Sequence, residues 1–120
     1  MARLLLVEDD RAYRERLALA LEERGFSVRT ADCAKAACGC AVGELDAAIV
    51  DLRLGTDSGL DVLAELRRRA PELRLVLLTG HASAVARLTA MRLGAAVLRK
   101  PADIDDIVRA VCGEPDSGEE

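Results

Sequence analysis

The sequence predicts an α/β domain in which helices cover both faces of a five-stranded parallel sheet. Short apolar runs alternate with amphipathic segments five times along the 120 residues, a pattern typical of parallel strands joined by helical crossovers. Most of the runs are continuously apolar, as expected for strands that are buried on both faces. With 51% hydrophobic residues, the chain can form one domain with a single core.

Five segments have the length and apolar character of strands. One of them, residues 26–30, alternates apolar and polar side chains, as a more exposed edge strand does. The predicted strands comprise residues 3–7, 26–30, 47–50, 73–78 and 95–98. The flavodoxin-like order 2-1-3-4-5 is one of two common arrangements of such doubly wound sheets, and five strands in this length favour it.

The segments between the strands have helical periodicity and recognisable ends. Asp10, Ser58 and Asp103 are suitable N-caps, and Gly25 is a suitable C-terminal stop. The helices are expected over residues 11–24, from Asp32 to near Gly43, between Ser58 and Pro71, over about 83–92 and from Asp103 onward. Residues 1–112 therefore form the predicted domain, and residues 113–120 are interpreted as an acidic linker or tail.

Composition argues against several classes of function. The net charge of −4 disfavours a general nucleic-acid surface, which would be basic. No apolar run approaches the ~18 residues that a membrane span needs, and the N-terminus lacks the pattern of a signal peptide, so we expect a cytoplasmic protein with no membrane partner. The four cysteines form no C-x-x-C pair and the chain has one histidine, so a zinc site is weakly supported.

Polar and charged residues follow four of the predicted strands. Glu8 and Asp9 come after the first strand, Asp51 after the third, Thr79 after the fourth and Lys100 after the fifth. The carboxyl ends of parallel strands share one edge of a sheet, where ligands collect. Clustered carboxylates require a cation, and oxygen ligands with access to water suit Mg²⁺. A lysine and a hydroxyl beside them can contact phosphoryl oxygens, so the constellation indicates phosphoryl transfer to a carboxylate.

Four motifs resemble those of receiver domains of two-component response regulators, and together they extend over about residues 3 to 112. They are Leu5-Leu6-Val7-Glu8-Asp9-Asp10, Val50-Asp51-Leu52, Leu78-Thr79-Gly80 and Lys100-Pro101. The resemblance implies that Asp51 accepts a phosphoryl group from a sensor histidine kinase. It also implies that Glu8, Asp9, Asp51 and the backbone carbonyl of Arg53 bind Mg²⁺. Thr79 would be the switch hydroxyl and Lys100 the lysine that contacts the phosphate, and the Lys100-Pro101 peptide bond would be cis.

The resemblance further implies a regulatory domain rather than an enzyme. Phosphorylation would change the face formed by the fourth helix and the fifth strand. Together with the fifth helix, this face could also form the interface of a homodimer. Relatives often carry an aromatic residue where this chain has Val97, and we hypothesise a muted or rerouted output there. We expect control of transcription through a DNA-binding domain that is absent from this chain.

Two alternatives stay open. The first is a stand-alone regulator or phosphorelay intermediate. The second is an aspartyl-phosphate phosphatase, a class that needs a second acid two residues after the nucleophile, where Arg53 stands.

Overall fold

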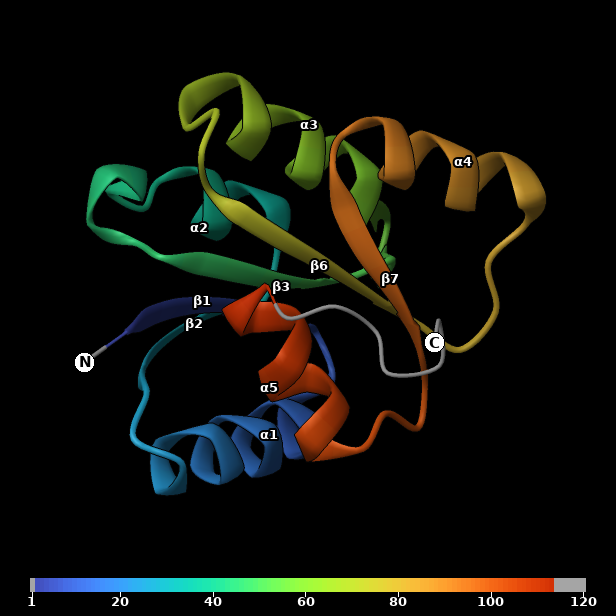
Figure 1. Cartoon of the computed structure of the whole chain (residues 1–120). Helices are drawn as coiled ribbons and strands as arrows, with labels where there is room; N and C mark the ends of the chain where they lie inside the picture. The colour runs from blue at the N-terminus through green and yellow to red at the C-terminus, as the bar shows by residue number, and fades with distance from the viewer. Residues whose placement is uncertain (1, 114–120) are drawn as a thin grey trace.

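The computed structural model describes residues 2–113, and five of its strands form one parallel sheet (Figure 1). These strands are β1 (Arg3–Val7), β2 (Ser27–Ala31), β3 (Ala47–Asp51), β6 (Arg74–Thr79) and β7 (Ala95–Arg99). Their order is β2-β1-β3-β6-β7, so the predicted 2-1-3-4-5 topology is confirmed. Residues 114–120, which hold most of the predicted acidic tail, lie outside the described residues.

The helices form one layer on each face of the sheet. They are α1 (Arg11–Glu23), α2 (Ala34–Cys38), α3 (Gly59–Arg69), α4 (Ala84–Arg92) and α5 (Ile104–Cys112). α1 and α5 cover one face, and α2, α3 and α4 cover the other (Figure 1). Within residues 2–113, none of the helices combines the length and the hydrophobicity that crossing a bilayer would demand.

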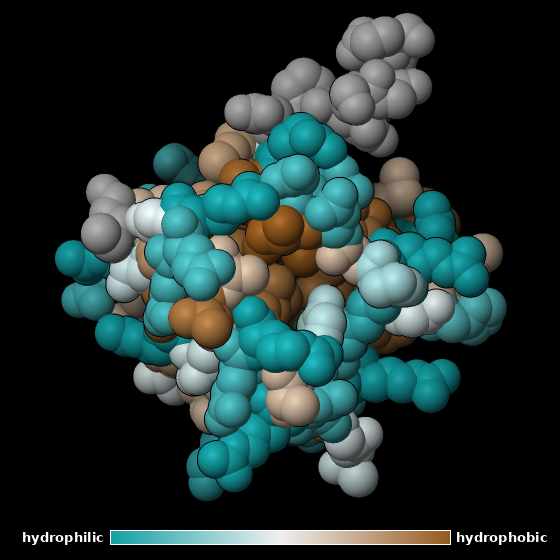
Figure 2. All heavy atoms as spheres, turned by 90° about the horizontal axis from the view of Figure 1, so that it is seen from below, coloured by the Kyte–Doolittle hydropathy of each residue, from teal (hydrophilic) through white to brown (hydrophobic). Residues whose placement is uncertain are grey.

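Alternate residues of each central strand enter opposite layers of the core, because successive side chains of a strand point to opposite faces. In β1, Leu5 and Val7 pack against the α2–α4 layer, whereas Leu4 and Leu6 pack against α1 and α5. Figure 2 shows the α1–α5 face, where hydrophilic side chains surround hydrophobic ones near the middle. The continuous apolar runs of the sequence therefore supply both layers at once.

The predicted helix caps at Asp10, Ser58 and Asp103 are confirmed. Each side chain accepts a hydrogen bond from a backbone N–H in the first turn of its helix, which satisfies a donor that has no partner within the helix. Gly25 follows α1 with a φ of 96°, as predicted for a glycine stop. The boundaries of the helices were therefore predictable from local chemistry where a polar cap was present.

The prediction that Asp32 opens a long second helix was wrong. α2 begins after Cys33, whose side chain makes no capping hydrogen bond. The N–H of Ala34 donates instead to the carboxylate of Asp57, at 3.2 Å. The cap thus comes from a residue 23 positions further along the chain, which no local pattern indicates.

The second helix is also shorter than the roughly ten residues predicted. It ends at Cys38, because the carbonyl of Cys38 accepts a hydrogen bond from the Arg69 side chain of α3 and Gly39 follows as the C-cap. A short 3₁₀ helix, Val42–Glu44, then leads into β3.

Arg67 joins the end of α3 to the end of α4. Its guanidinium donates to the backbone carbonyls of Pro71 at 2.7 Å, Leu73 at 2.8 Å and Leu93 at 2.8 Å. Leu93 is the C-cap of α4. One side chain therefore satisfies carbonyls at the exits of two helices, where helical partners are missing.

A two-stranded antiparallel hairpin, β4 (Arg53–Leu54) and β5 (Asp57–Ser58), follows β3 and was not predicted. The hairpin returns the chain to Gly59, whose N–H donates to the carbonyl of Leu52 at 2.7 Å. An ideal β-carbon on Gly59 would lie 2.1 Å from the backbone oxygen of Asp51. Only glycine allows this approach, so the position of Asp51 depends on Gly59.

We predict that Gly59→Ala lowers the free energy of unfolding by about 1–3 kcal/mol, because the added methyl group overlaps the backbone of Asp51. Urea denaturation followed by circular dichroism measures the effect. Gly43→Ala is the matched control, since no atom lies within 4 Å of an ideal β-carbon there. Equal stabilities of the two variants would contradict the prediction.

Candidate functional site

Residues from four strands meet at the carboxyl edge of the sheet. Glu8 directly follows β1, and its N–H donates to the carbonyl of Ala31 at 3.0 Å. Asp51 and Thr79 are the last residues of β3 and β6. The N–H of Lys100 donates to the carbonyl of Thr79 at 2.8 Å, which fixes Lys100 to the same edge. The structure therefore brings Glu8, Asp51, Thr79 and Lys100 together, in agreement with the predicted constellation.

Three carboxylates form a compact cluster at this edge. Each of Glu8, Asp9 and Asp51 contributes one carboxylate oxygen, and these three oxygens lie within 4.8 Å of one another. Glu8 is 1% exposed and Asp51 is 7% exposed, whereas Asp9 lies at the surface. Hard oxygen donors that are partly buried and open to water on one side fit Mg²⁺ or Ca²⁺. The donor set thus fits the divalent cation that the sequence predicts.

Lys100 supplies the positive charge of the cluster. Its Nζ lies 2.9 Å from Oε1 of Glu8 and 3.3 Å from Oδ2 of Asp51. Burial alone would lower the pKa of Lys100, but the hydrogen bond to Glu8 and the charges of both carboxylates outweigh it, and the pKa is raised above its ordinary value. Lys100 therefore stays protonated across the physiological range.

Glu8 uses both of its carboxylate oxygens. Oε1 faces Lys100, and Oε2 accepts the backbone N–H of Asp10 at 3.0 Å. Burial raises the pKa of Glu8, and the hydrogen bonds from Lys100 and Asp10 only partly counteract this. The carboxyl of Glu8 is therefore more easily protonated than that of an ordinary glutamate.

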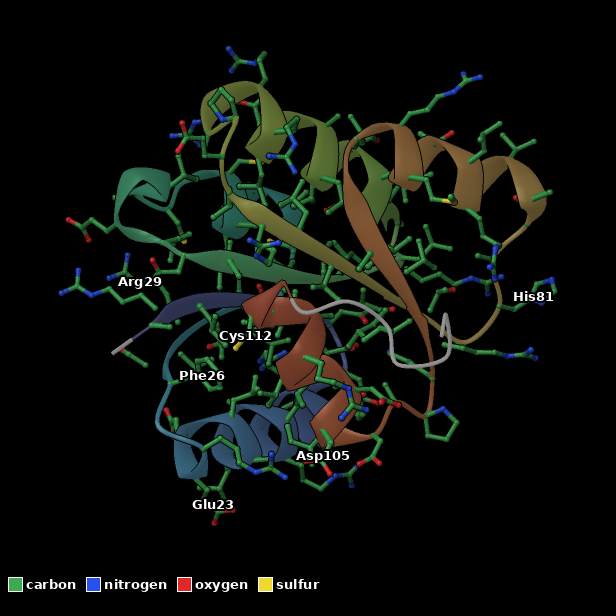
Figure 3. All side chains as sticks on the ribbon, in the orientation of Figure 1. Glu23, Phe26, Arg29, His81, Asp105 and Cys112 are labelled. Carbon is green, nitrogen blue, oxygen red and sulfur yellow. The ribbon has the colours of Figure 1, made fainter. Side chains whose placement is uncertain are left out.

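Thr79 is buried, and its hydroxyl oxygen accepts the backbone N–H of His81 at 3.1 Å. His81 itself is exposed, and its side chain points outward from the loop between β6 and α4 (Figure 3). Arg53 begins β4 with an exposed side chain. The Lys100-Pro101 peptide bond is cis, as the resemblance implies.

Tyr13 of α1 lies beside the site, and the sequence analysis did not include it among the site residues. Its ring centroid lies 4.6 Å from Nζ of Lys100. The sequence offers one indication of this position: Tyr13 comes three residues after the cap Asp10, in a chain with one tyrosine and one phenylalanine.

The cysteines lie outside this cluster. Cys33, Cys38 and Cys40 are half-buried, Cys112 is exposed, and all four are free. Burial raises the pKa of the Cys38 thiol, which disfavours the reactive thiolate.

The sequence is similar to those of two proteins named as regulatory proteins. The chain is 42% identical to the acid tolerance regulatory protein ActR of Sinorhizobium medicae (strain WSM419) over 93% of its own length and 59% of ActR. It is 43% identical to the photosynthetic apparatus regulatory protein RegA of Rhodobacter capsulatus over 90% of its length and 60% of RegA. The chain thus spans about three-fifths of these relatives.

Two solved structures share the fold. A response regulator from Burkholderia pseudomallei, with a phosphorylated aspartic acid, calcium ion and citrate, has a TM-score of 0.81 and 34% identity over 92% of this chain and 66% of that one. The response regulator TrrA from Thermotoga maritima, in complex with Mg²⁺-BeF, has a TM-score of 0.83 and 26% identity over 94% of this chain and 98% of that one.

The family model described as "Response regulator receiver domain" matches residues 4–112, which include every strand end of the cluster. Together with the sheet order and the relatives, this match shows that the chain belongs to the family of response regulator receiver domains.

Proposed function

We propose that the chain is a phosphorylation-activated switch in which Asp51 accepts a phosphoryl group from a sensor histidine kinase. The observation that carries this proposal is the cluster of Glu8, Asp9 and Asp51 with Lys100 at one sheet edge. Asp51 is the natural acceptor, because it ends the central strand β3 while Glu8 and Asp9 are adjacent in sequence and can act as a pair. The domain is regulatory and assists only its own phosphorylation and dephosphorylation.

In the proposed reaction, a carboxylate oxygen of Asp51 attacks the phosphorus of a phosphohistidine. A phosphorus–oxygen bond forms, the phosphorus–nitrogen bond breaks, and the imidazole leaves with the electron pair and takes up a proton. We assign Lys100 to the oxygens of the transferred group, and its Nζ, 3.3 Å from Oδ2 of Asp51, supports this role. The hydroxyl of Thr79 is the second group on this chain that we assign to those oxygens.

Mg²⁺ is the proposed cofactor. The clustered carboxylates of Glu8, Asp9 and Asp51 would hold it. We assign the backbone carbonyl of Arg53 as a further ligand. Bound there, Mg²⁺ would neutralise charge on the transferred phosphoryl group.

The proposed output begins at Thr79 and Lys100. A phosphoryl group adds about −1.5 to −2 charges near neutral pH, which favours a conformation with both residues drawn toward it. Changes there would repack α4 and β7. Val97 of β7 packs against the α2–α4 layer of the core without an aromatic ring, so we propose that the output on this face is muted or takes another route.

We further propose that the α4–β7–α5 face contacts a second copy of the chain. Val85, Leu88 and Met91 of α4 are 74%, 50% and 60% exposed, so large apolar side chains gather at the surface of this helix. The names of ActR and RegA describe regulatory proteins. AlgB of Pseudomonas syringae pv. tomato, 40% identical over 88% of this chain and 24% of AlgB, is named as a transcriptional regulatory protein, which supports control of transcription. We propose a cytoplasmic protein that acts through a DNA-binding output domain, with a single-domain regulator as the alternative.

We predict that acetyl phosphate with Mg²⁺ adds the mass of one phosphoryl group to the protein, and that Asp51→Asn abolishes this gain because the amide is not a nucleophile of the same kind. Intact-mass spectrometry measures the outcome. Asp46→Asn serves as the control, since Asp46 caps the opposite edge of the sheet through the N–H of Arg3. A mass gain that survives in Asp51→Asn would overturn the proposed function.

We predict that Asp9→Asn weakens Mg²⁺ binding at least about tenfold, because it removes one charged ligand from the site. Asp10→Asn is a closely matched control: it removes the same charge one residue away, and asparagine caps a helix as well as aspartate does. Isothermal titration calorimetry compares the two. Equal losses of affinity would assign the effect to net charge and would remove Asp9 from the proposed ligand set.

We predict that Mg²⁺ affinity falls as the pH is lowered, because a protonated carboxyl cannot bind the ion. Burial raises the pKa of Glu8, so the fall begins at a higher pH than an ordinary glutamate would give. The hydrogen bond from Lys100 lowers the pKa of Glu8, so Lys100→Met should move the midpoint to still higher pH. A midpoint that moves to lower pH in this variant would contradict the assignment.

A further inference from the structure

The only tyrosine of the chain lies beside the phosphorylation site. Nζ of Lys100 is 4.6 Å from the centroid of the Tyr13 ring, within the range of a cation–π interaction. The chain has one tyrosine and one phenylalanine and no tryptophan, and Phe26 is half-buried against the core of the α1–α5 layer. Tyr13 is therefore the one of these two rings that lies against Lys100.

Tyr13 and Lys100 belong to a closed circuit of contacts. Lys100 contacts Oε1 of Glu8 at 2.9 Å, and Oε2 of Glu8 accepts the N–H of Asp10 at 3.0 Å. Oδ1 of Asp10 accepts the N–H of Tyr13 at 3.2 Å, and the ring of Tyr13 returns to Lys100. The first turn of α1 is thereby fixed to Glu8, and its aromatic ring to the lysine.

The three partners of Lys100 differ in what else binds them. Glu8 and Asp51 are also the proposed ligands of the divalent cation, so the cation and the ammonium compete for the same oxygens. The face of a phenol ring attracts an ammonium and offers no hard oxygen charge to Mg²⁺. Tyr13 is thus the one described partner of Lys100 that the cation does not share.

We propose that Tyr13 is a positioning residue for Lys100, and that its ring holds the ammonium at the mouth of the site when the carboxylates bind a divalent cation. This inference rests on the proposed function, since it concerns the lysine that meets the phosphoryl group. It also gives α1 a direct contact with that lysine, on the side of the sheet opposite α4.

The aromatic face can be separated from the bulk of the side chain. Tyr13 packs against the α1–α5 layer of the core, so an apolar replacement of similar size fills much of the same space. Tyr13→Phe keeps the aromatic face and removes the hydroxyl, whereas Tyr13→Leu keeps an apolar side chain and removes the face. Phe26→Leu removes the other aromatic ring from the same layer and is the matched control.

Nuclear magnetic resonance of lysine-labelled protein tests the contact without phosphorylation. The chain has two lysines, and Lys35 on α2 is the internal reference. We expect the methylene protons next to Nζ of Lys100 to be shielded by the ring, and to remain shielded at saturating Mg²⁺ in the wild type, Tyr13→Phe and Phe26→Leu. Tyr13→Leu should lose the shielding. Loss of shielding in the wild type on adding Mg²⁺ would overturn the proposal without reference to any variant.

The rate of phosphorylation by acetyl phosphate at saturating Mg²⁺ tests the consequence. In that reaction Asp51 displaces acetate from phosphorus. We expect Tyr13→Leu to react about threefold to tenfold more slowly, as the strength of a cation–π contact implies, and Tyr13→Phe and Phe26→Leu to react within about twofold of the wild type. A wild-type rate in Tyr13→Leu would overturn the inference alone. A wild type that gains no phosphate on Asp51 would overturn the proposed function, while the lysine spectra still decide the role of Tyr13.

Discussion

Repulsion among like charges is the constraint on which the rest of the structure depends. Three carboxylates whose oxygens lie within 4.8 Å destabilise the fold unless positive charge is placed among them. Lys100 provides that charge from a position 92 residues beyond Glu8, and it can do so only when β1, β3, β6 and β7 are all in place. The order of the strands therefore determines the charge balance of the site.

Three residues connect this edge of the sheet to the neighbouring helices. Asp10 caps α1 with its side chain while its N–H binds Glu8. Asp57 caps α2 from the hairpin that follows Asp51, so the loop after Asp51 and the start of a neighbouring helix share one hydrogen bond. Gly59 keeps the next helix against the backbone of Asp51. The surroundings of Asp51 are therefore connected to the starts of α1, α2 and α3 through single contacts.

The strands and the residues of the carboxyl edge could be predicted because both depend on local patterns, whereas the strand order was chosen from the two common arrangements of doubly wound sheets. Continuous apolar runs indicate buried parallel strands, and a polar residue after such a run falls at the shared edge. The short α2, the β4–β5 hairpin and the contact of Tyr13 with Lys100 were not predicted. Asp57 and Arg69 bind the two ends of α2, and Lys100 meets Tyr13, from distant parts of the chain, and a long-range hydrogen bond or ring contact leaves no periodic signal in the sequence.

The carbonyls bound by Arg67 have a consequence for α4. Arg67 holds the C-terminal end of the helix to α3 and to the residue before β6, whereas the buried side chains of the helix are the alanines Ala86 and Ala90. Their small methyl groups make few dispersion contacts with neighbouring side chains. If the proposed phosphorylation shifts the Thr79 end, we expect the start of α4, with the exposed Val85 and Leu88, to move further than the end that Arg67 holds at Leu93.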